Sequence, residues 1–580
     1  MSNNVTLTID GQSVTIPAGV TIWAAARKLG IHIPTLCHHF DVKPYAGCRV
    51  CVVEVEGARS LAAACAFPVS EGMVVKTNTQ KVREARKLVV ELLLANHPRN
   101  CLTCDRSQNC ELQELALELG VHEVRFKGAK PNWPIDDSNP CIVRDQNKCV
   151  LCGRCVRVCS EKQTVNVYTF ANRGFDSTVT PAFGKGLGKV KCTYCGQCSA
   201  VCPTGAITVK DDTEKVIAAI NDPTKIVVVQ TAPAVRVALG ELFGGEPGSI
   251  VTGKMVGALK MLGFDRVLDT NFTADLTIME EAAEFLDRFK SNWDMPMITS
   301  CSPGWINFLE LFYPDLVKHH SSCKSPQQMF GALVKTYYAQ EQRIDPKNIV
   351  SVSIMPCTAK KFEALRPEMR SSGYQDVDYV LTTRELGKLL KSSGIFFNDI
   401  QEQEFDSIMG LGTGAGTIFG NTGGVMEAAL RTAYEKVTGK ALENIEFNVV
   451  RGMGGIREAD IDLDGTQIRV AVAHGLGNAR QVMEAIKQGN RNRWDFIEVM
   501  ACPGGCIAGG GQPISSDINF RAKRIAGLYE DDRNLPLRKS HENPEILAIY
   551  RDFLGEPGGH KSHKLLHTQL IKQGREVDVN

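Results

Sequence analysis

The 580-residue sequence lacks the marks of a membrane protein or an exported protein. It has no apolar run near the roughly 20 residues that a membrane-spanning helix needs. Its first residues, MSNNVTLTIDG, lack the basic segment, the apolar core and the twin arginine of an export signal. We therefore expect a cytoplasmic protein, in an anaerobe, that does not associate with a membrane.

The sequence also lacks a charge surplus and a nucleotide-binding fingerprint. Its net charge is +1 with 23% charged residues, so nothing in the composition favours nucleic acid as a partner. A glycine-rich GLGTGAG stretch at residues 410–416 has no βαβ context and no ribose-binding acid at the expected distance. We expect this stretch to line a pocket before a helix that starts near Gly423, and we expect no flavin or nicotinamide site.

Cysteine, by contrast, is plentiful. The chain has 21 cysteines, which without export indicates metal ligands rather than disulfides. Two runs share the C-x2-C-x2-C-x3-C spacing of two-cluster bacterial ferredoxins: Cys149, Cys152, Cys155 and Cys159, then Cys192, Cys195, Cys198 and Cys202. Paired zinc knuckles would leave the fourth cysteines and Pro203 unexplained. The runs predict two 4Fe–4S clusters, with the fourth cysteine of each run ligating the other run's cluster.

A third group of cysteines lies in a predicted β region near the N-terminus. An alternating hairpin at residues 5–16 turns at Asp10-Gly11, and a helix ending at Gly30 follows. This region resembles a plant-type 2Fe–2S ferredoxin, although the internal spacings differ from the plant pattern. The expected ligands are Cys37, Cys48, Cys51 and Cys65.

A fourth group follows an amphipathic helix that carries an apolar stripe through residues 82–93. Its spacing is His-x3-Cys-x2-Cys-x5-Cys, made by His97, Cys101, Cys104 and Cys110. One histidine with three cysteines is compatible with zinc. Its place between two iron–sulfur modules favours a 4Fe–4S cluster, whose potential the neutral imidazole would raise.

Most of the remaining cysteines lie in loops that follow short β-branched runs. Cys301 lies in PMITSCSPGW, Cys357 in VSVSIMPCTAKKFE, and Cys502 and Cys506 in FIEVMACPGGCIAGGGQP. Three strands are thus predicted to deliver thiols at their carboxyl ends, where open α/β sheets build their sites. The glycines after Cys502 would let the backbone approach something bulky. We expect Cys141 and Cys323 to be ordinary core thiols.

These three loops resemble the signature motifs of the iron-only hydrogenases. The resemblance covers essentially the entire chain and includes TAPAVR, NFTADLTIMEEAAE, KSPQQMFGA, FGNTGGVMEAALR and KSHENPEI. It implies an H-cluster, a 4Fe–4S cubane joined to a di-iron centre with CO, cyanide and a bridging dithiolate. It implies that Cys357, Cys502 and Cys506 are ligands, with Cys506 shared between the sub-clusters. Lys360 would hydrogen-bond a cyanide ligand unless it is an ordinary surface lysine, and further cofactor contacts would be Gln327, Met355 and Met500.

The sequence departs from the family where two adjacent cysteines are usual, because it has Cys301-Ser302. Register puts Ser302 at the position of the usual cubane ligand and Cys301 at that of the proton relay. Since a serine hydroxyl is a poor iron ligand, we expect Cys301 to ligate and Ser302, or a water, to serve the proton path. The resemblance continues that path through Glu281, Ser321, Glu284 and Arg288. Glu281 and Glu284 share a helix face, but a solvated acidic face would have the same composition.

The expected architecture is modular α+β. It comprises a β-grasp 2Fe–2S ferredoxin domain (residues 1–80), a His/Cys3 4Fe–4S domain (81–140) and a two-4Fe–4S ferredoxin domain (141–210). A large two-lobed α/β catalytic domain (211–515) and a polar helical tail that packs on it (516–580) complete the chain.

The resemblance implies a hydrogenase that interconverts H2 with two protons and two electrons. A redox-sensing or electron-transfer protein with an altered site is the alternative that Ser302 keeps open. The accessory modules also resemble the large iron–sulfur subunit of respiratory NADH dehydrogenase. We therefore expect flavin- and NAD(P)-binding partner subunits, together with ferredoxin, in an electron-bifurcating complex. A stand-alone ferredoxin-linked enzyme is the other hypothesis.

Overall fold

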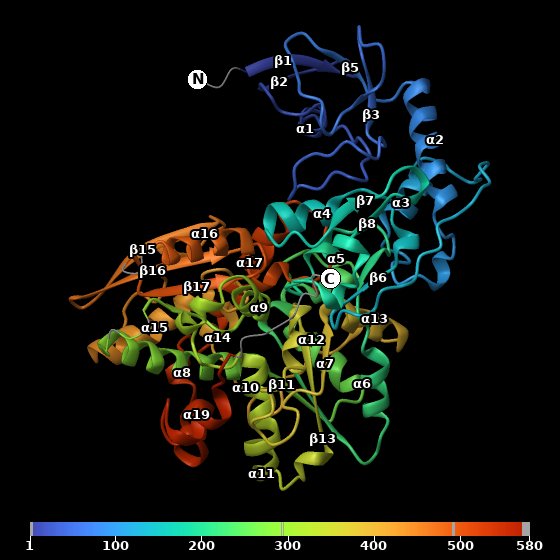
Figure 1. The fold of residues 1–580 in the computed structure, drawn as a ribbon. Helices are drawn as coiled ribbons and strands as arrows, with labels where there is room; N and C mark the ends of the chain where they lie inside the picture. The colour runs from blue at the N-terminus through green and yellow to red at the C-terminus, as the bar shows by residue number, and fades with distance from the viewer. Residues whose placement is uncertain (1–3, 292, 294, 490–492, 571–580) are drawn as a thin grey trace. The chain divides into compact units, whose positions relative to one another are not determined.

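The computed structural model describes residues 4–291, 293, 295–489 and 493–570, which form two compact units (Figure 1). The smaller unit contains the described residues of Met1–Lys162, Asn166–Val190 and Val201–Thr208. The larger unit contains those of Gln163–Val165, Lys191–Ala200 and Val209–Asn580.

The smaller unit begins with a five-stranded sheet in the order β2-β1-β5-β3-β4. The expected hairpin forms, because Asp10 and Gly11 both adopt the positive φ angles (48° and 82°) that a tight turn needs. Thr21 caps the following helix by accepting a hydrogen bond from Ala24 N. The elements are β1 (Asn4–Ile9), β2 (Gln12–Pro17), α1 (Ile22–Lys28), β3 (Val52–Val55), β4 (Ala62–Ala63) and β5 (Val74–Lys76).

Two helices and several short elements complete the smaller unit. Helix α2 (Gln80–Asn96) buries Val90 against Leu112 and Leu115 of α3 (Glu111–Glu118), with Val89 and Leu93 of the predicted apolar stripe half-buried beside them. Leu92, which the stripe included, is 48% exposed. The short elements that follow are β6 (Ile142–Arg144), α4 (Arg154–Arg157), β7 (Thr169–Ala171) and β8 (Thr178–Thr180); α5 (Gln197–Val201) and β9 (Ile207–Val209) include residues of both units.

The larger unit is built on two four-stranded sheets, as expected for a two-lobed α/β domain. The first sheet is parallel, in the order β11 (Arg266–Asp269), β10 (Ile226–Thr231), β13 (Ile349–Met355) and β14 (Tyr379–Thr382). The second has the order β12 (Met297–Ile298), β17 (Phe496–Met500), β16 (Thr466–His474) and β15 (Ile456–Leu463), and only β15 is antiparallel to its neighbour. The central strands are buried along their length, because helices cover both faces of such sheets.

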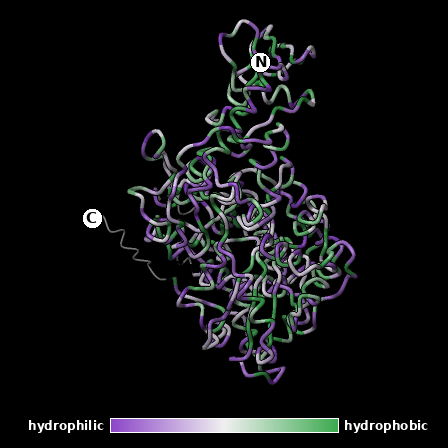
Figure 2. The backbone as a smooth tube through the Cα atoms, turned by 90° about the vertical axis from the view of Figure 1, so that its right-hand side faces the viewer, coloured by the Kyte–Doolittle hydropathy of each residue, from purple (hydrophilic) through white to green (hydrophobic). Residues whose placement is uncertain are grey.

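Hydrophobic stretches run inside the larger unit, while its outer loops are mostly hydrophilic (Figure 2). Its longest described helix, α8 (Thr270–Ser291), is buried over most of its length. None of the described helices is long and apolar enough to cross a membrane. The other helices before residue 510 are α6 (Thr213–Ile220), α7 (Thr252–Met261), α9 (Pro303–Phe312), α10 (Pro326–Leu333), α11 (Ala339–Glu341), α12 (Ala359–Ala364), α13 (Thr383–Ser392), α14 (Gly414–Ile418), α15 (Gly424–Thr438) and α16 (Leu476–Lys487).

The C-terminal segment packs on this unit through three helices. Helix α17 (Phe520–Asn534) contacts α14, α18 (Pro544–Ile549) contacts α8, and α19 (His560–Leu566) contacts α10. The sequence predicted a helical tail over residues 516–580; residues 571–580 lie outside the described part of the chain.

Candidate functional site

Three loops of the larger unit carry the thiols that the sequence singled out. Cys301 follows β12, Cys357 follows β13, and Cys502 and Cys506 follow β17. As predicted, each loop lies at the carboxyl end of a parallel strand, where α/β proteins place their reactive groups. Cys502 is buried and the other three are half-buried.

The thiols of this group suppress one another's ionisation. Burial and Cys357 raise the pKa of Cys506 to about 12, and the same two causes raise the pKa of Cys502 well above its usual value. Burial also raises the pKa of Cys357 to about 11, although Lys360 opposes it. Thiolates crowded in such a place need a compensating cation, so this donor set fits an iron–sulfur centre.

Close backbone packing explains the glycines around Cys506. A Cβ atom on Gly505 (φ 96°) would lie 2.7 Å from Thr422 N, and one on Gly509 would lie 2.2 Å from Pro356 O. Pro356 directly precedes Cys357, so only a glycine lets the β17 loop lie against the β13 loop. The glycine-rich stretch is therefore needed for close packing and is not merely a flexible turn.

Cys301 and Ser302 have different surroundings. Burial raises the pKa of the Cys301 thiol, and Cys506, Glu281 and Glu498 add to the rise. The Ser302 hydroxyl instead accepts a hydrogen bond of 3.2 Å from Ala501 N, next to Cys502. The thiol of Cys301 thus shares its surroundings with Glu281, and the hydroxyl of Ser302 lies beside the β17 loop.

The other expected cofactor contacts lie around α12. Lys360 is 7% exposed, so it is not an ordinary surface lysine, and its Nζ lies 2.8 Å from Glu363 Oε2. Gln327 donates to Glu363 at 3.1 Å, while its buried Oε1 has no partner among the described residues. Met355 and Met500 are each 2% exposed at the ends of β13 and β17.

The expected proton-carrying groups form a connected set. Glu281 is fully buried and accepts from Ser300 N at 2.9 Å, while its Oε2 has no hydrogen-bond partner among the described residues. Ser321 approaches Glu281 and donates to Glu284 Oε2 at 2.8 Å. Arg288 donates to Glu284 Oε1 at 2.5 Å. These carboxyls are not a solvated helix face.

The two carboxyls differ in proton affinity. Burial raises the pKa of Glu281 to about 7, and the hydrogen bonds from Ser300 offset it only in part. Burial would also raise the pKa of Glu284, but Arg288 and the Ser322 amide outweigh it and hold the pKa below its usual value. Neighbouring carboxyls of unequal pKa, linked by a hydroxyl, are suited to moving a proton in steps.

Sequence reasoning missed Glu498, the buried carboxyl in the middle of β17. It accepts hydrogen bonds from Gly423 N at 2.6 Å and Met426 N at 2.8 Å, at the start of α15. Burial raises the pKa of Glu498 to about 6. The signal in the sequence was a single glutamate inside the apolar run FIEVM. Burying a carboxyl costs free energy unless hydrogen bonds or a function compensate, so a glutamate in a buried strand is unusual.

In the smaller unit the four cysteines near the N-terminus converge. The Cys37 thiol forms side-chain hydrogen bonds with Cys48 and Cys65, and Cys51 forms one with Cys65. Three of the four residues are buried and Cys48 is half-buried. Sulfur atoms in mutual contact are the arrangement that a small two-iron cluster needs.

His97 has a ring nitrogen that is available to act as a metal ligand. Its Nδ1 lies 2.6 Å from Pro98 O, so Nδ1 carries the proton and Nε2 keeps a lone pair. Nε2 is buried and has no partner in the described part of the chain. Of the three cysteines of this group, Cys101 is exposed and Cys104 and Cys110 are half-buried.

The first ferredoxin run shares a pocket with a cysteine of the second run. Cys202 and Pro203 line this pocket together with Cys149, Cys152 and Cys155. The grouping supports the exchange of fourth ligands that the spacing predicted. The remaining cysteines of the second run, Cys192, Cys195 and Cys198, belong to the larger unit.

Within the larger unit this second run packs against the catalytic loops. Gln197 donates to Ala508 O at 3.0 Å, and Thr358 donates to Tyr194 O at 2.7 Å. Cys195 is among the groups that raise the pKa of Cys502. The Cys192–Cys198 loop therefore lies against the Cys357 and Cys502 loops.

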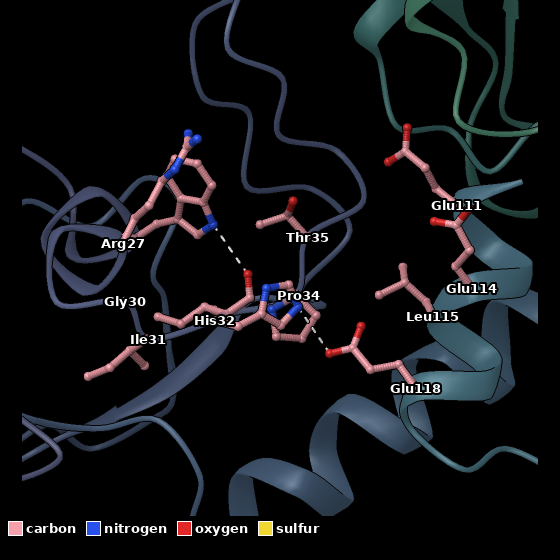
Figure 3. Close-up of a pocket in the computed structure, with 12 residues that line it drawn as sticks. Arg27, Gly30, Ile31, His32, Pro34, Thr35, Glu111, Glu114, Leu115 and Glu118 are labelled. Atoms are coloured by element: carbon pink, nitrogen blue, oxygen red, sulfur yellow. Dashed lines mark hydrogen bonds and ion pairs between the residues drawn. The ribbon is translucent and has the colours of Figure 1, made fainter. Parts of the chain in front are cut away.

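A second cavity of the smaller unit is lined by acidic side chains. It has a volume of about 360 Å³ and lies between α1 and α3 (Figure 3). Glu111, Glu114 and Glu118 line one side, and His32 faces Glu118 at 3.1 Å. It contains none of the cluster cysteines.

Family models match five successive parts of the chain. Their descriptions are "2Fe-2S iron-sulfur cluster binding domain" (residues 2–80), "NADH-ubiquinone oxidoreductase-G iron-sulfur binding region" (86–125), "4Fe-4S dicluster domain" (148–206), "Iron only hydrogenase large subunit, C-terminal domain" (225–510) and "Iron hydrogenase small subunit" (518–572). These matches confirm the fold class and the kinds of cluster domain predicted from the cysteine spacings.

Curated relatives match over nearly the whole length. The NADP-reducing hydrogenase subunit HndD of Solidesulfovibrio fructosivorans is 50% identical, over 98% of this chain and 99% of that protein. Iron hydrogenase 1 of Clostridium pasteurianum is 40% identical, over 98% and 100%. A solved structure of the FeFe-hydrogenase HydA1 from Chlamydomonas reinhardtii is 45% identical, covers 63% of this chain and 99% of its own, and superposes with a TM-score of 0.56.

Proposed function

This chain belongs to the iron-only hydrogenase family, and we propose that it is the hydrogen-activating subunit of a multisubunit NAD(P)-linked hydrogenase. It is an enzyme that interconverts H2 with two protons and two electrons, and it carries 2Fe–2S and 4Fe–4S domains that relay the electrons. The observation that carries the assignment to a complex is the 50% identity to an NADP-reducing hydrogenase subunit over 98% of the chain.

The H-cluster, when bound, supplies the iron at which H2 is cleaved. Cys357, Cys502 and Cys506 would hold it, because their buried thiols suppress one another's ionisation and need a cation. Lys360 and Gln327 would hold its outer ligands. Their support is the buried lysine beside Cys357 and the buried Gln327 Oε1 that has no partner among the described residues.

For Cys301 and Ser302 the geometry favours the reverse of the roles expected from ligand chemistry. The Cys301 thiol shares its surroundings with Glu281 and Cys506, which supports a role as the proton carrier next to the cofactor. Ser302 lies beside Ala501, next to Cys502, and this supports a role in which Ser302 would help to hold the cofactor, through its oxygen or through a water.

Infrared spectra of two variants separate these roles. Cys301→Ala is expected to keep the CO and cyanide bands and to lose turnover by roughly 10²-fold or more, as loss of a proton carrier does. Ser302→Cys is the matched variant and is expected to keep the bands and the activity. Loss of the CO and cyanide bands in Cys301→Ala would instead support the original expectation that Cys301 is the ligand.

Protons would travel between Cys301 and the surface through Glu281, Ser321, Glu284 and Arg288. The support is the Glu281 Oε2 atom without a hydrogen-bond partner among the described residues, the Ser321 hydroxyl between the two carboxyls, and the ion pair of Glu284 with Arg288. Glu281 would bind and release a proton near neutral pH, because burial raises the pKa of its carboxyl to about 7.

Electrons would travel through one 2Fe–2S cluster and three accessory 4Fe–4S clusters, divided among the domains expected from the sequence. The converging N-terminal thiols and the lone pair on His97 Nε2 support the first two centres. Together with a six-iron H-cluster, a fully loaded chain would hold about 20 iron atoms. An iron content near 12 atoms per chain would contradict at least two of these cluster assignments.

The electron partners would be flavin- and NAD(P)-binding subunits and ferredoxin, in the cytoplasm. This chain has no recognised nucleotide fingerprint, so the isolated, matured polypeptide is expected to oxidise H2 with artificial dyes or ferredoxin. Reduction of NAD(P)+ should appear only after flavoprotein subunits are added. Reduction of NAD(P)+ by the isolated chain would contradict the proposal, and an infrared spectrum without CO and cyanide bands would favour a sensing or electron-transfer protein.

A further inference from the structure

Further buried titratable groups lie next to Glu284. Ligand atoms of Glu284, Cys323 and His567 all lie within 4.8 Å of one another. The Cys323 thiol donates to Glu284 Oε2 at 3.7 Å and lies 3.9 Å from His567 Nδ1. Cys323 was expected to be an ordinary core thiol, but it bridges a carboxyl and an imidazole.

His567 comes from the C-terminal segment, at the end of α19. Its Nε2 lies 2.9 Å from Glu280 Oε2, and its Nδ1 lies 2.8 Å from the Ser322 hydroxyl. The carboxylate needs a donor, so Nε2 carries the proton and Nδ1 is left to accept one from Ser322. Glu280 is itself held by Tyr550 and by Gly558 N, so the ring has a fixed orientation.

Two features connect this imidazole with the surface. Ser322 is only half-buried, so water can reach the hydroxyl that faces Nδ1. The ring of His563, which is exposed, stacks on His567 with ring centres 4.8 Å apart and planes inclined by 12°. A hydroxyl and a second imidazole thus stand between solvent and a buried imidazole.

Histidine, cysteine and glutamate are also zinc ligands, but each of these groups is already engaged. Glu284 accepts from Ser321, Ser322 N and Arg288, and His567 pairs with Glu280 and Ser322. A metal would have to break this network. A chain of donors and acceptors from a half-buried hydroxyl to a carboxyl is instead what a proton needs.

We infer that Ser322, His567 and Cys323 form a second proton branch, which joins Glu284 to solvent in parallel with Arg288. In each transfer His567 Nδ1 first takes a proton from the Ser322 hydroxyl, which recovers one from water, while Nε2 keeps its own proton on Glu280. The Cys323 thiol then gives its proton to Glu284 Oε2 and takes the extra proton from His567 Nδ1, so the ring returns to its neutral form. One proton moves inward, no group changes its redox state, and the reverse order serves H2 oxidation. The branch rests on the proposed proton route through Glu284.

Titratable and polar groups from several elements face the His567 imidazole and suit it to proton transfer. Glu280 and Glu284 approach it from α8, Ser322 and Cys323 from the loop before α10, Tyr550 acts through Glu280, and His563 lies one turn earlier on α19. Burial and the nearby carboxylates raise the pKa of the Cys323 thiol, so Cys323 passes a proton without remaining ionised.

The two parallel proton branches are tested in the matured holoprotein by substituting Arg288 and His567 one at a time and then together. Arg288→Ala and His567→Gln are each expected to lower turnover by less than about 10-fold, since the other branch stays open. The double variant is expected to lose on the order of 10²-fold or more, with CO and cyanide bands unchanged and a larger solvent isotope effect. A double variant no slower than Arg288→Ala would overturn the branch. Glutamine keeps neutral hydrogen bonds to Glu280 and Ser322 but carries no proton.

Tyr550→Phe is the matched structural control. It removes the hydrogen bond to Glu280 Oε1, whereas Gly558 N and His567 Nε2 keep their hydrogen bonds to Oε2, so the ring stays oriented. It is therefore expected to lower the melting temperature without slowing Arg288→Ala further. If Tyr550→Phe slows Arg288→Ala as much as His567→Gln does, His567 only pins the C-terminal segment and the branch is wrong.

A spectroscopic readout is independent of turnover. The S–H stretching band of Cys323, identified by its loss in Cys323→Ala, is expected to shift in Glu284→Gln because the thiol donates to that carboxyl. An unmoved band would overturn the link between them. Normal turnover in Glu284→Gln would contradict the proposed main proton route through Glu284. If Glu284→Gln is slow but the turnover losses of Arg288→Ala and His567→Gln are merely additive in the double variant, the main route stands and the second branch is wrong.

Discussion

The cysteine loops of the two units differ in what surrounds their thiols. In the smaller unit Cys101 is exposed, His97 Nε2 has no partner among the described residues, and the buried charges beside Cys110 and Cys152 are the arginines Arg106 and Arg154. In the larger unit the thiols of Cys357 and Cys506 lie among buried charged groups, including Glu498 and Lys360. Electron transfer needs only ligated iron near a partner, whereas hydrogen chemistry also needs a path for protons.

Removal of one ligand from each unit gives the largest contrast. Cys357→Ala is expected to abolish the CO and cyanide infrared bands and to reduce H2 oxidation to background, because the cofactor loses a ligand that no neighbour replaces. Cys101→Ala should keep the bands and the dye-linked activity, since it alters only an accessory centre. Loss of the infrared bands in Cys101→Ala would show that the two units do not divide these tasks.

Proton transfer should depend on the larger unit alone. Glu281→Gln is expected to slow turnover by roughly 10²- to 10⁴-fold while the infrared bands persist, because glutamine cannot carry a proton. The raised pKa of Glu281, about 7, means that the wild-type carboxyl is protonated below that pH and loses its proton as pH rises through it. Proton delivery for H2 evolution should therefore decline above about pH 7 in the wild type, and the variant should lack this inflection in its pH profile.

A smaller change is expected at His97, in the unit that carries electrons. His97→Cys should keep a 4Fe–4S cluster and lower its potential, on the order of 100 mV, because a thiolate adds negative charge to the iron. A redox titration followed by electron paramagnetic resonance measures the shift, and turnover with dyes should change little. Zinc in place of iron, or a raised potential, would contradict histidine ligation.

The sequence was most informative where the ligands are close together in the chain. The spacing of the ferredoxin runs predicted that Cys202 belongs with Cys149, Cys152 and Cys155, and these residues line one pocket. Local spacing is sufficient there because a tight loop fixes most ligands of a cubane. The strands before Cys301, Cys357 and Cys502 could likewise be identified, because each is a short β-branched run next to proline or glycine.

The proton-carrying groups could not be identified in this way. Glu281 and Glu284 were expected from family resemblance, and their composition alone would also suit an exposed helix face. Only the fold shows that Glu281 is fully buried and that Ser321, from a loop distant in the chain, stands between the two carboxyls. Burial of a carboxyl depends on what packs over it, which local sequence does not encode.

The sequence by itself determined the metal chemistry of this protein, because cysteine spacing within a loop fixes which sulfur atoms can converge. The tertiary structure decided which buried carboxyl, thiol and imidazole groups lie in contact with one another. Glu498 reaches its partners at the start of α15, and Cys323 meets His567 from 244 residues away. Hydrogen-bond chains of this kind are assembled from separate elements, so the pairing exists only once α8, α10 and α19 have packed together.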